Sequence, residues 1–377
     1  MTTPPPSSAA VVIIGGGVIG LSTAYHLAAA GVRDVVLVDK GALGSGSTSK
    51  AAGGVRALFS DPVNIMLGAR SLETFAGFRA RLGQEIDFRR VGYLFLLGDP
   101  TAVASFEAAV ALQHELGVPA RMIGAREAQK LSPLIGTDGV LAAVHSPLDG
   151  HCTPESVVLG YATAARRAGA RLIPHCAVTG LDPGTVHTEG GDIRTDTVIC
   201  AAGAWSARVG SWAGVELPVT PLRRQILVTE PVPGLDPHTP FTIDLDTTYY
   251  FHNEGAGLLI GMSDPDETPG FKLGRSDTWL PRLGEAVARR TPGLADVGIA
   301  GGWAGLYEVT PDHNALIGRA GSFLYATGFS GHGFLMGPAV GEVMRDLYLG
   351  REPFTDVSGL GADRFARAAA RPELNIV

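Results

Sequence analysis

Residues 9–39 read AAVVIIGGGVIGLSTAYHLAAAGVRDVVLVD, and this stretch decides the fold. The apolar, largely β-branched run at 9–14 predicts a strand buried on both faces. Three glycines interrupt it, apolar residues at helical spacing follow, and Gly31 predicts the end of that helix. The run at 35–38 predicts a second buried strand ending at Asp39. A strand, a helix and a strand within about 30 residues form a right-handed βαβ unit, which requires a parallel sheet.

The glycines between the first strand and the helix form the motif Gly15-x-Gly17-x-x-Gly20. Gly15 permits the tight turn, Gly17 lets a pyrophosphate approach the backbone, and Gly20 allows close helix–sheet packing. The helix N-terminus then offers free N–H groups and a partial positive charge to phosphates. Asp39, at the end of the second strand, is suited to accept hydrogen bonds from ribose hydroxyls. A purely structural glycine turn would leave Asp39 unexplained, so the sequence predicts a dinucleotide site.

Composition excludes several classes of protein. The 377 residues are 45% hydrophobic and 18% charged, which excludes a disordered chain and suggests two domains. The net charge of −7, without Lys/Arg clusters, argues against nucleic-acid binding. No apolar run reaches the ~20 residues of a membrane span. Three cysteines, Cys152, Cys176 and Cys200, lack metal or disulfide spacing. We therefore expect no metal site and a cytoplasmic protein.

Residues 1–8, which begin MTTPPPSS, lack the basic and apolar regions of a secretory signal, so we expect a short flexible tail. Strands of the buried type recur at 171–173, 197–201 and 323–327, and a closing helix is expected at 338–349. Shorter alternating strands between them, at 226–229, 249–251 and 258–260, favour an antiparallel sheet. The expected fold is α/β, with a discontinuous Rossmann-type domain and a second α+β domain on a largely antiparallel sheet. The expected segments are 9–90, 150–214 and 301–377 for the first domain, and 91–149 and 215–300 for the second.

Two further glycine-rich segments indicate whether the dinucleotide is FAD or NAD. Residues 41–56, GALGSGSTSKAAGGVR, form a loop of small residues that can offer backbone N–H groups and hydroxyls to phosphate or a flavin edge. Residues 328–338, GFSGHGFLMGP, follow a strand and open a helix. A helix N-terminus at the pyrimidine edge of a flavin would stabilise the negative charge of the reduced ring. The two segments favour FAD.

Five segments carry a resemblance to a known family. They are GGGVIG, GSGSTSKAAGGVRALFSDP, TVICAAGAWS, GLYEVTPDHNALIG and YATGFSGHGFLMGPAVGEV, in this order along the chain. The chain resembles the FAD-dependent amine and amino-acid oxidoreductases that include sarcosine oxidase, glycine oxidase and D-amino-acid oxidase. Within that family, GGVRALFSDP looks most like the sarcosine oxidase β-subunit and L-proline dehydrogenase branch.

The resemblance implies an FAD enzyme. Its reaction would oxidise the C–N bond of an amino acid or a secondary or N-methylated amine by hydride transfer to flavin N5, giving an imine. O2 or another electron acceptor would then reoxidise the flavin. The implied cofactor-binding residues are Gly15, Gly17, Val18, Ile19, Gly20, Asp39, Lys40, Ser45, Gly46, Ser47, Thr48, Ala52, Gly53, Val178, Ala202, Gly203, Trp205, Gly305, Gly331, His332, Gly333, Phe334 and Leu335.

Departures from the family pattern change some of these expectations. A cysteine that tethers FAD in monomeric sarcosine oxidase is matched here by Gly305, so non-covalent FAD is expected. The lysine that promotes reaction with oxygen is matched by Leu259, and a carboxylate-binding lysine by Leu335. These departures leave open whether the protein is an oxidase or a dehydrogenase.

Three residues are the candidates for substrate contact. Arg56 matches the family's carboxylate-binding arginine, and a planar guanidinium binds a carboxylate by two parallel hydrogen bonds. Tyr249 and Tyr250 are neighbours on a strand, so only one of them can face the flavin. Tyr250 and His332, which lies between two glycines, complete the set. Asp312 and His313 are interpreted as part of a turn.

Other functions remain open at this point. The chain is alternatively the amine-oxidising subunit of a hetero-oligomeric dehydrogenase complex, which co-purification would reveal. It is alternatively a flavin-fold module without turnover, or, less well supported, an NAD-dependent dehydrogenase, which would not be yellow. A homo- or hetero-oligomer is compatible with each of these functions.

Overall fold

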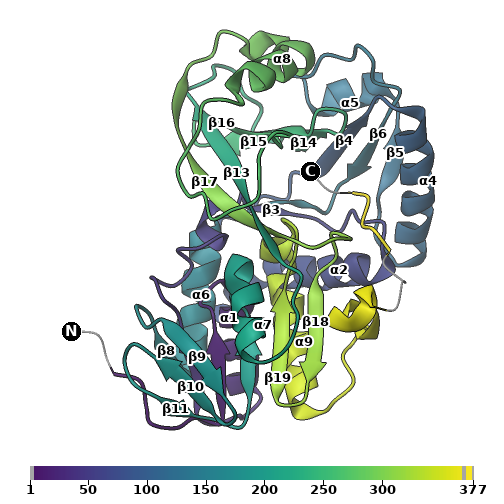
Figure 1. Cartoon of the computed structure of the whole chain (residues 1–377). Helices are drawn as coiled ribbons and strands as arrows, with labels where there is room; N and C mark the ends of the chain where they lie inside the picture. The colour runs from purple at the N-terminus through teal and green to yellow at the C-terminus, as the bar shows by residue number, and fades with distance from the viewer. Residues whose placement is uncertain (1–3, 367–370, 376–377) are drawn as a thin grey trace.

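The βαβ unit expected from residues 9–39 lies at the centre of a six-stranded sheet in the lower lobe of the molecule (Figure 1). The structure is a computed structural model that describes residues 4–366 and 371–375. The strand order is β18-β19-β12-β1-β2-β8, and all strands are parallel except the edge strand β18. The strands are β1 (Val11–Ile14), β2 (Val35–Val38), β8 (Arg171–Ile173), β12 (Val198–Cys200), β18 (Leu316–Ala320) and β19 (Phe323–Thr327).

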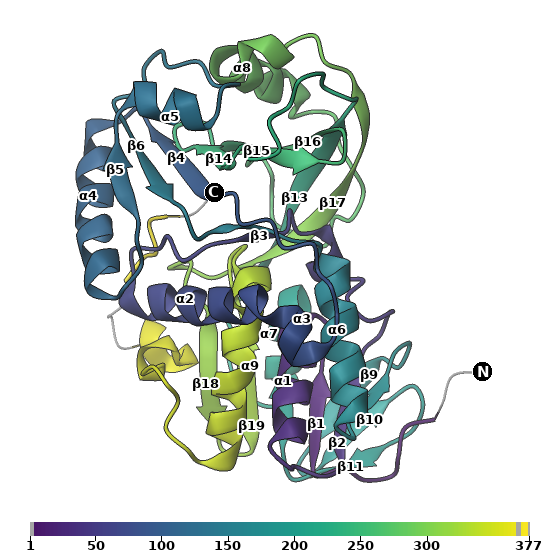
Figure 2. The same ribbon diagram turned by 180° about the vertical axis from the view of Figure 1, so that it is seen from behind.

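Both faces of this sheet are covered, which explains why its strands are apolar throughout. Ile13 and Leu37 point into the core beneath three helices, whereas Val12 and Val36 point into the core on the other face. The helices are α1 (Val18–Ala29), α6 (Pro154–Arg167) and α9 (Gly333–Leu349), seen in front of the sheet in Figure 2. The opposite face carries β9 (Val178–Asp182), β10 (Thr185–Thr188), β11 (Ile193–Arg194) and α7 (Ser206–Trp212).

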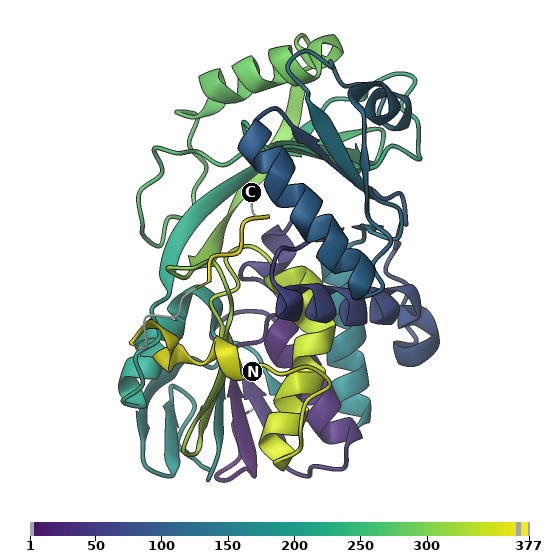
Figure 3. The same cartoon turned by 90° about the vertical axis from the view of Figure 1, so that its right-hand side faces the viewer.

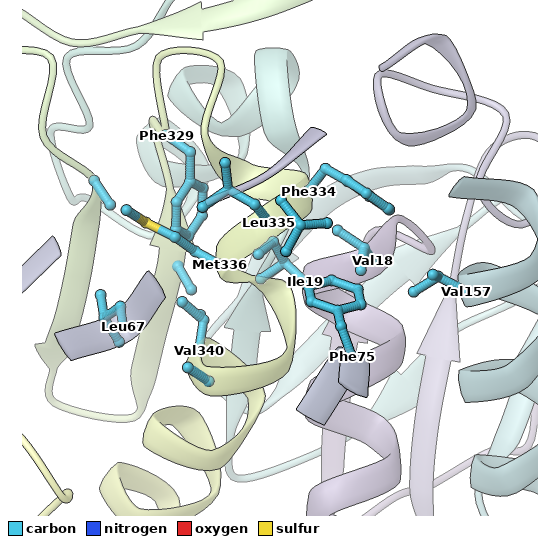
Figure 4. Close-up of a cluster of buried hydrophobic side chains, with 14 of the residues drawn as sticks. Val18, Ile19, Leu67, Phe75, Val157, Phe329, Phe334, Leu335, Met336 and Val340 are labelled. Atoms are coloured by element: carbon cyan, nitrogen blue, oxygen red, sulfur yellow. The ribbon is translucent and has the colours of Figure 1, made fainter. Parts of the chain in front are cut away.

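Glycines let the helices approach one another and the sheet. A Cβ on Gly20 would lie 1.9 Å from the carbonyl oxygen of Gly15, so α1 can sit over β1 only with glycine there. A Cβ on Gly341 would lie 2.1 Å from Ser22 Oγ, and one on Gly337 would lie 2.6 Å from Val18 Cγ2. Around this contact between α1 and α9, apolar side chains from α1, α2 (Pro62–Ala76), α6 and α9 form a close-packed cluster (Figure 4).

The upper lobe is built on an eight-stranded sheet of order β17-β13-β16-β15-β14-β4-β6-β5. Only β14 and β4 pair in parallel, so the largely antiparallel second sheet is confirmed. Its strands are β4 (Tyr93–Leu97), β5 (Arg121–Ile123), β6 (Ala142–Ser146), β13 (Thr220–Thr229), β14 (Phe241–Asp244), β15 (Tyr249–Glu254), β16 (Gly257–Gly261) and β17 (Ile299–Val309).

Helices flank the upper sheet and connect it to the lower lobe (Figures 1 and 3). Phe95 of the sheet packs against Phe106 of α4 (Pro100–Glu115), while Leu94 of the sheet and Leu283 of α8 (Leu280–Arg290) belong to a separate core. The remaining elements are α2 (Pro62–Ala76), α3 (Phe78–Leu82), α4 (Pro100–Glu115), α5 (Ala125–Leu131), α8 (Leu280–Arg290), and the ribbon of β3 (Gly54–Val55) with β7 (Gly150–His151).

Three elements differ from the sequence expectations. The closing helix begins at Gly333 rather than at Pro338. Proline lacks the N–H group that a helical residue normally donates, but the packing around Pro338 keeps the preceding turn helical. β17 pairs with β13 from Ile299 to Val309, so it crosses the expected domain boundary at 301. In the expected flexible tail, the Ser7 carbonyl accepts a hydrogen bond from Arg194 N at 3.0 Å, so this part is held against β11. Residues 1–3 of that tail lie outside the described residues.

The packing of Gly20 generates a stability prediction. We expect Gly20→Ala to lower the apparent Tm by about 5 °C or more, because its Cβ would overlap a backbone oxygen that cannot move freely. Gly284→Ala in α8 is the control, since a Cβ there meets nothing within 4 Å and helix propensity favours alanine. Differential scanning calorimetry of both variants checks this. Equal Tm values for the two variants would contradict it.

Candidate functional site

A cavity of about 840 Å³ lies between the two lobes. Its lower wall is formed by the turn after β1, the end of β2, the loop at 41–54, the residues after β12 and the start of α9. Its upper wall is formed by side chains of β4, β13, β14, β15 and β17. Open α/β sheets bind ligands at the carboxyl ends of their parallel strands, and this cavity opens there.

The residues assigned to the cofactor from the sequence come together on this cavity, with one exception. All of them line it except Gly20, which is used for packing α1 against β1. The candidates for substrate contact, Arg56, Tyr250 and His332, line it as well. Their binding roles remain proposals, but their common location is a property of the fold.

One end of the cavity has the features of a nucleotide site. The N–H groups of Gly17 and Ile19, at the start of α1, have no acceptor within the described residues, and both residues line the cavity. Between these two residues, Val18 N donates a hydrogen bond to Thr48 Oγ1 at 3.1 Å, which connects the 41–54 loop to the helix. Unpaired donors at a helix N-terminus are suited to bind a pyrophosphate.

Asp39 is held in place by the backbone around it. Its Oδ2 accepts a hydrogen bond from Gly16 N at 2.6 Å, and its Oδ1 accepts one from Gly41 N at 2.7 Å. Each carboxylate oxygen has a second lone pair for a further donor. The side chain is therefore fixed at the cavity wall and still able to accept bonds from ribose hydroxyls.

Aromatic and cationic side chains close this end. Lys40 Nζ lies 3.2 Å from the ring centroid of Trp205, a cation–π contact. Trp205 in turn stacks on Phe271 with 5.2 Å between centroids. Val178, on β9, completes this part of the wall.

The start of α9 presents a second set of donors. The N–H groups of Gly333, Phe334 and Leu335 have no acceptor within residues 4–366 and 371–375, and all three residues line the cavity. Gly331 has φ +100, and a Cβ there would lie 2.5 Å from the Tyr307 ring. Glycine is thus required where the chain turns into the helix, and the helix N-terminus faces the cavity with its partial positive charge.

Beyond this point the cavity becomes an aromatic chamber. Tyr93 stacks on Phe241 with 4.4 Å between ring centroids, and Phe241 stacks on Tyr250 at 5.7 Å. Tyr249 points the other way, into the upper core, where its hydroxyl lies 3.1 Å from Thr291 Oγ1. Burial raises the pKa of Tyr93 and Tyr250, so both hydroxyls stay protonated.

Arg56 lines the chamber, and two of the five N–H donors of its guanidinium are engaged by backbone carbonyls. Its Nη2 donates to the carbonyl of Asn375 at 2.6 Å and its Nη1 donates to the carbonyl of Leu58. The guanidinium carbon lies 4.2 Å from the ring centroid of Phe59. Behind it, the buried Asp149 accepts a hydrogen bond from Ala57 N at 3.2 Å, and burial raises the pKa of Asp149 to about 7.

His332 is the N-cap residue of α9, and its ring meets Phe59 edge-on at 5.0 Å. Burial, with the nearby Arg56 and His313 charges, lowers its pKa well below the usual range. The ring is therefore neutral at physiological pH. Asp312, by contrast, is bound through both carboxylate oxygens to Arg364 at 2.8 Å, away from the cavity, as a turn interpretation of this segment requires.

The residues of the wall that sequence reasoning missed include Tyr93, Phe241, Arg224, Tyr307 and Glu308. Glu308 accepts a hydrogen bond from Thr327 Oγ1 at 3.0 Å, and burial raises its pKa to about 7. Side chains alternate along a strand, so only one of the neighbours Arg223 and Arg224 can face the cavity. Tyr307 and Glu308 lie in the segment GLYEVTPDHNALIG, which carries the family resemblance, but that resemblance did not assign either residue to the cavity wall.

A second cavity, of about 610 Å³, lies behind the 41–54 loop. Ala51 and Ala52 line both cavities and so form the partition between them. His252 and Leu259 face the second cavity. The position matched to the oxygen-promoting lysine therefore lies outside the first cavity. Within the described part of the chain, no group of three His, Cys, Asp or Glu side chains could hold a metal ion, and no helix is long and apolar enough to cross a membrane.

Comparison with known proteins identifies the family. A family model described as FAD dependent oxidoreductase matches residues 10–347. The chain belongs to this family. Among solved structures, the chain is similar to L-proline dehydrogenase from P. horikoshii, with a TM-score of 0.91 and 32% identity over 97% of this chain and 100% of that one. Glycine oxidase from Geobacillus kaustophilus gives a TM-score of 0.85 and 25% identity over 95% and 99%.

Two curated relatives of this chain are longer proteins. Dimethylglycine dehydrogenase of Mus musculus is 32% identical over 93% of this chain and 43% of its own length. Sarcosine dehydrogenase of Mus musculus is 29% identical over 92% of this chain and 40% of its own length. The chain thus spans about two fifths of the length of these relatives.

The residues present fit FAD. The unpaired N–H groups of Gly17 and Ile19 suit the pyrophosphate, and Asp39 suits a ribose. The small residues of the 41–54 loop and the unpaired N–H groups of Gly333 to Leu335 leave room and donors for a flavin. A Cβ on Gly305 would lie 2.7 Å from Lys50 Cβ, so this position neither carries nor accommodates a tethering thiol.

The geometry of Asp39 predicts its contribution to cofactor affinity. We expect Asp39→Ala to raise the Kd for FAD by about 10- to 100-fold, because the ribose loses its acceptor and two backbone donors lose theirs. FAD fluorescence titration of the deflavinated protein measures this. Glu107→Ala, which removes one exposed carboxylate on α4, is the control and should bind FAD as the wild type does. A wild-type Kd for Asp39→Ala would contradict the assignment.

Asp149 predicts a pH dependence of stability. Its pKa is about 7 in the folded protein and near 3.8 in the unfolded chain, so the folded state binds more protons between these values. The contribution of the Asp149 carboxyl to the free energy of unfolding therefore falls as the pH rises from about 4 to 7. We expect Asp149→Asn to raise the Tm relative to wild type more at pH 8 than at pH 5. A Tm difference that is independent of pH would exclude this role for Asp149.

Proposed function

We propose that the chain binds FAD non-covalently and oxidises the C–N bond of an amino acid or a secondary or N-methylated amine to an imine. The observation that carries this proposal is one continuous cavity that joins a dinucleotide-binding end to an aromatic, cationic chamber. A flavin that extends from the nucleotide end would reach the chamber that contains Tyr250, Tyr307 and His332. The family relationship and the similarity to L-proline dehydrogenase and glycine oxidase structures support the same reaction class.

FAD, when bound, would supply the electron-accepting chemistry, and the chain would position the amine and exclude water. The protonation states of the chamber residues are compatible with these two roles. Burial keeps the hydroxyls of Tyr93 and Tyr250 protonated, and His332 is neutral. These groups therefore provide walls and hydrogen bonds without adding charge. Arg56, Tyr250 and His332 stay our proposed substrate-contact residues, with Arg56 supplying positive potential.

The electron acceptor is part of the proposal. No lysine occupies the position matched by Leu259, and that side chain lies on the second cavity. A missing cation weakens stabilisation of the negative charge that develops on oxygen. We therefore favour a dehydrogenase that uses an acceptor other than O2, alone or as the amine-oxidising subunit of a larger complex. The three buried free thiols fit a reducing compartment, which favours the cytoplasm.

The test is anaerobic reduction of the purified yellow protein. Sarcosine, dimethylglycine, glycine, L-proline, D-proline and simple amines are added in turn, and absorbance near ~450 nm is followed. We expect bleaching with at least one amine that carries a carboxylate, and slow recovery of the band in air. Fast recovery would identify an oxidase. Yellow protein that no amine bleaches would favour a module without turnover, and colourless protein that binds no FAD would refute the proposal.

A further inference from the structure

A long loop of the upper lobe reaches the nucleotide end of the cavity. Residues 262–279 connect β16 to α8 without forming a helix or a strand. Loops of this length are uncommon within a compact domain and are often functional. Both ends of the loop are anchored, since Met262 and Trp279 are buried in the core of the upper sheet. Its middle extends to the lower lobe, where Leu273 lines the cavity.

Phe271 joins this loop to the lower lobe. Its ring stacks on the ring of Trp205 with 5.2 Å between centroids and 25° between planes. Trp205 lines the cavity and is also contacted by Lys40, whose Nζ lies 3.2 Å from the Trp205 ring centroid. Phe271 itself is 49% exposed. The loop therefore lies across the rim of the cavity rather than in its interior.

An ion-pair cluster holds the loop in this position. Arg223 is the neighbour of the cavity-lining Arg224 on β13, so its side chain points to the other face of the strand. There its Nε donates to Glu267 Oε2 at 2.6 Å, and its Nη1 donates to the carbonyl of Gly274 at 2.8 Å. Lys272 Nζ donates to the second oxygen of Glu267 at 2.7 Å. Because the Glu267 side chain is only 2% exposed, these charge-assisted bonds are shielded from water.

The nucleotide end of the cavity opens to solvent. Lys40, Ser45 and Arg208 line the cavity and are exposed. At the other end, His332 and Phe334 line it and are buried. A dinucleotide whose pyrophosphate binds at the start of α1 would therefore enter and leave past the rim on which the loop lies.

We propose that the 262–279 loop is a gate for FAD, that is, a segment that must move before the cofactor can enter or leave. Phe271 closes the gate by stacking on Trp205, and the ion pairs of Glu267 hold the loop down. The closing contact is made between two side chains of the chain itself, so opening it costs the same before and after FAD binds. The gate therefore sets the rates of FAD binding and release and leaves the affinity unchanged. The inference rests on the proposed FAD binding and does not depend on which amine is oxidised.

Stopped-flow measurement of FAD binding to the deflavinated protein tests the gate. Association is followed by flavin fluorescence, and dissociation by capture of released FAD with an excess of an unrelated apoflavoprotein. We expect Phe271→Ala to raise the association and dissociation rate constants about 10-fold each, with Kd unchanged. Phe271→Leu, which keeps an apolar side chain without the stacked ring, should lie between Phe271→Ala and the wild type. Phe354→Ala is the matched control and should leave both rate constants unchanged, because Phe354 is 39% exposed and lines neither cavity.

Glu267→Gln tests the ion pairs independently of the aromatic contact. It removes the charge that Arg223 and Lys272 bind, so we expect both rate constants to rise about 3- to 10-fold with Kd unchanged. Wild-type rate constants for Phe271→Ala, or for Glu267→Gln where the first variant does not fold, would overturn the gate.

The affinity separates a gate from a direct contact with the cofactor. A faster dissociation alone, with a higher Kd as expected for Asp39→Ala, would overturn the gate, because Phe271 would then stabilise the bound cofactor itself. Protein that takes up no FAD would refute both proposals. FAD-binding protein that shows the expected rate changes but that no amine reduces would support the gate and refute the amine oxidation alone.

Discussion

The contact between the first turn of α1 and the turn after β1 is the constraint on which the site depends. Glycine at position 20 is required because any Cβ would overlap the carbonyl oxygen of Gly15. This close approach brings the helix N-terminus down to the end of the sheet, where its unpaired N–H groups face the cavity. Asp39 then connects β2 to the same turn through Gly16 N. The dinucleotide end is thus one rigid unit of backbone donors and a fixed carboxylate.

The chamber is built on a different principle. Its wall comes from the upper sheet, whose strands present alternating side chains to the cavity and to the upper core, as Tyr250 and Tyr249 do. Burial keeps its tyrosines and His332 uncharged, so the two arginines dominate its electrostatics. Both arginines, Arg56 and Arg224, donate hydrogen bonds to backbone carbonyls, and the buried Nε of Arg224 has no acceptor within the described residues.

Much of the lower lobe could be predicted from residue pattern. The strands at Val35–Val38, Arg171–Ile173 and Phe323–Thr327 begin and end where the apolar runs and the flanking turns place them. The pattern failed where tertiary contacts override local preference. α9 extends before Pro338 because Gly337 and Gly341 let it pack closely on α1. β17 extends past position 301 because its partner β13, far away in sequence, pairs with it along its whole length.

The sequence by itself determined the βαβ unit and the dinucleotide motif, because each of these depends on neighbours within a few tens of residues. Only the tertiary structure decided which groups surround the arginines of the cavity. A carbonyl that accepts from Arg56 belongs to Asn375, and the tyrosine ring beside Arg224 belongs to β17. These groups come from distant parts of the chain, so no local pattern around Arg56 or Arg224 could reveal them.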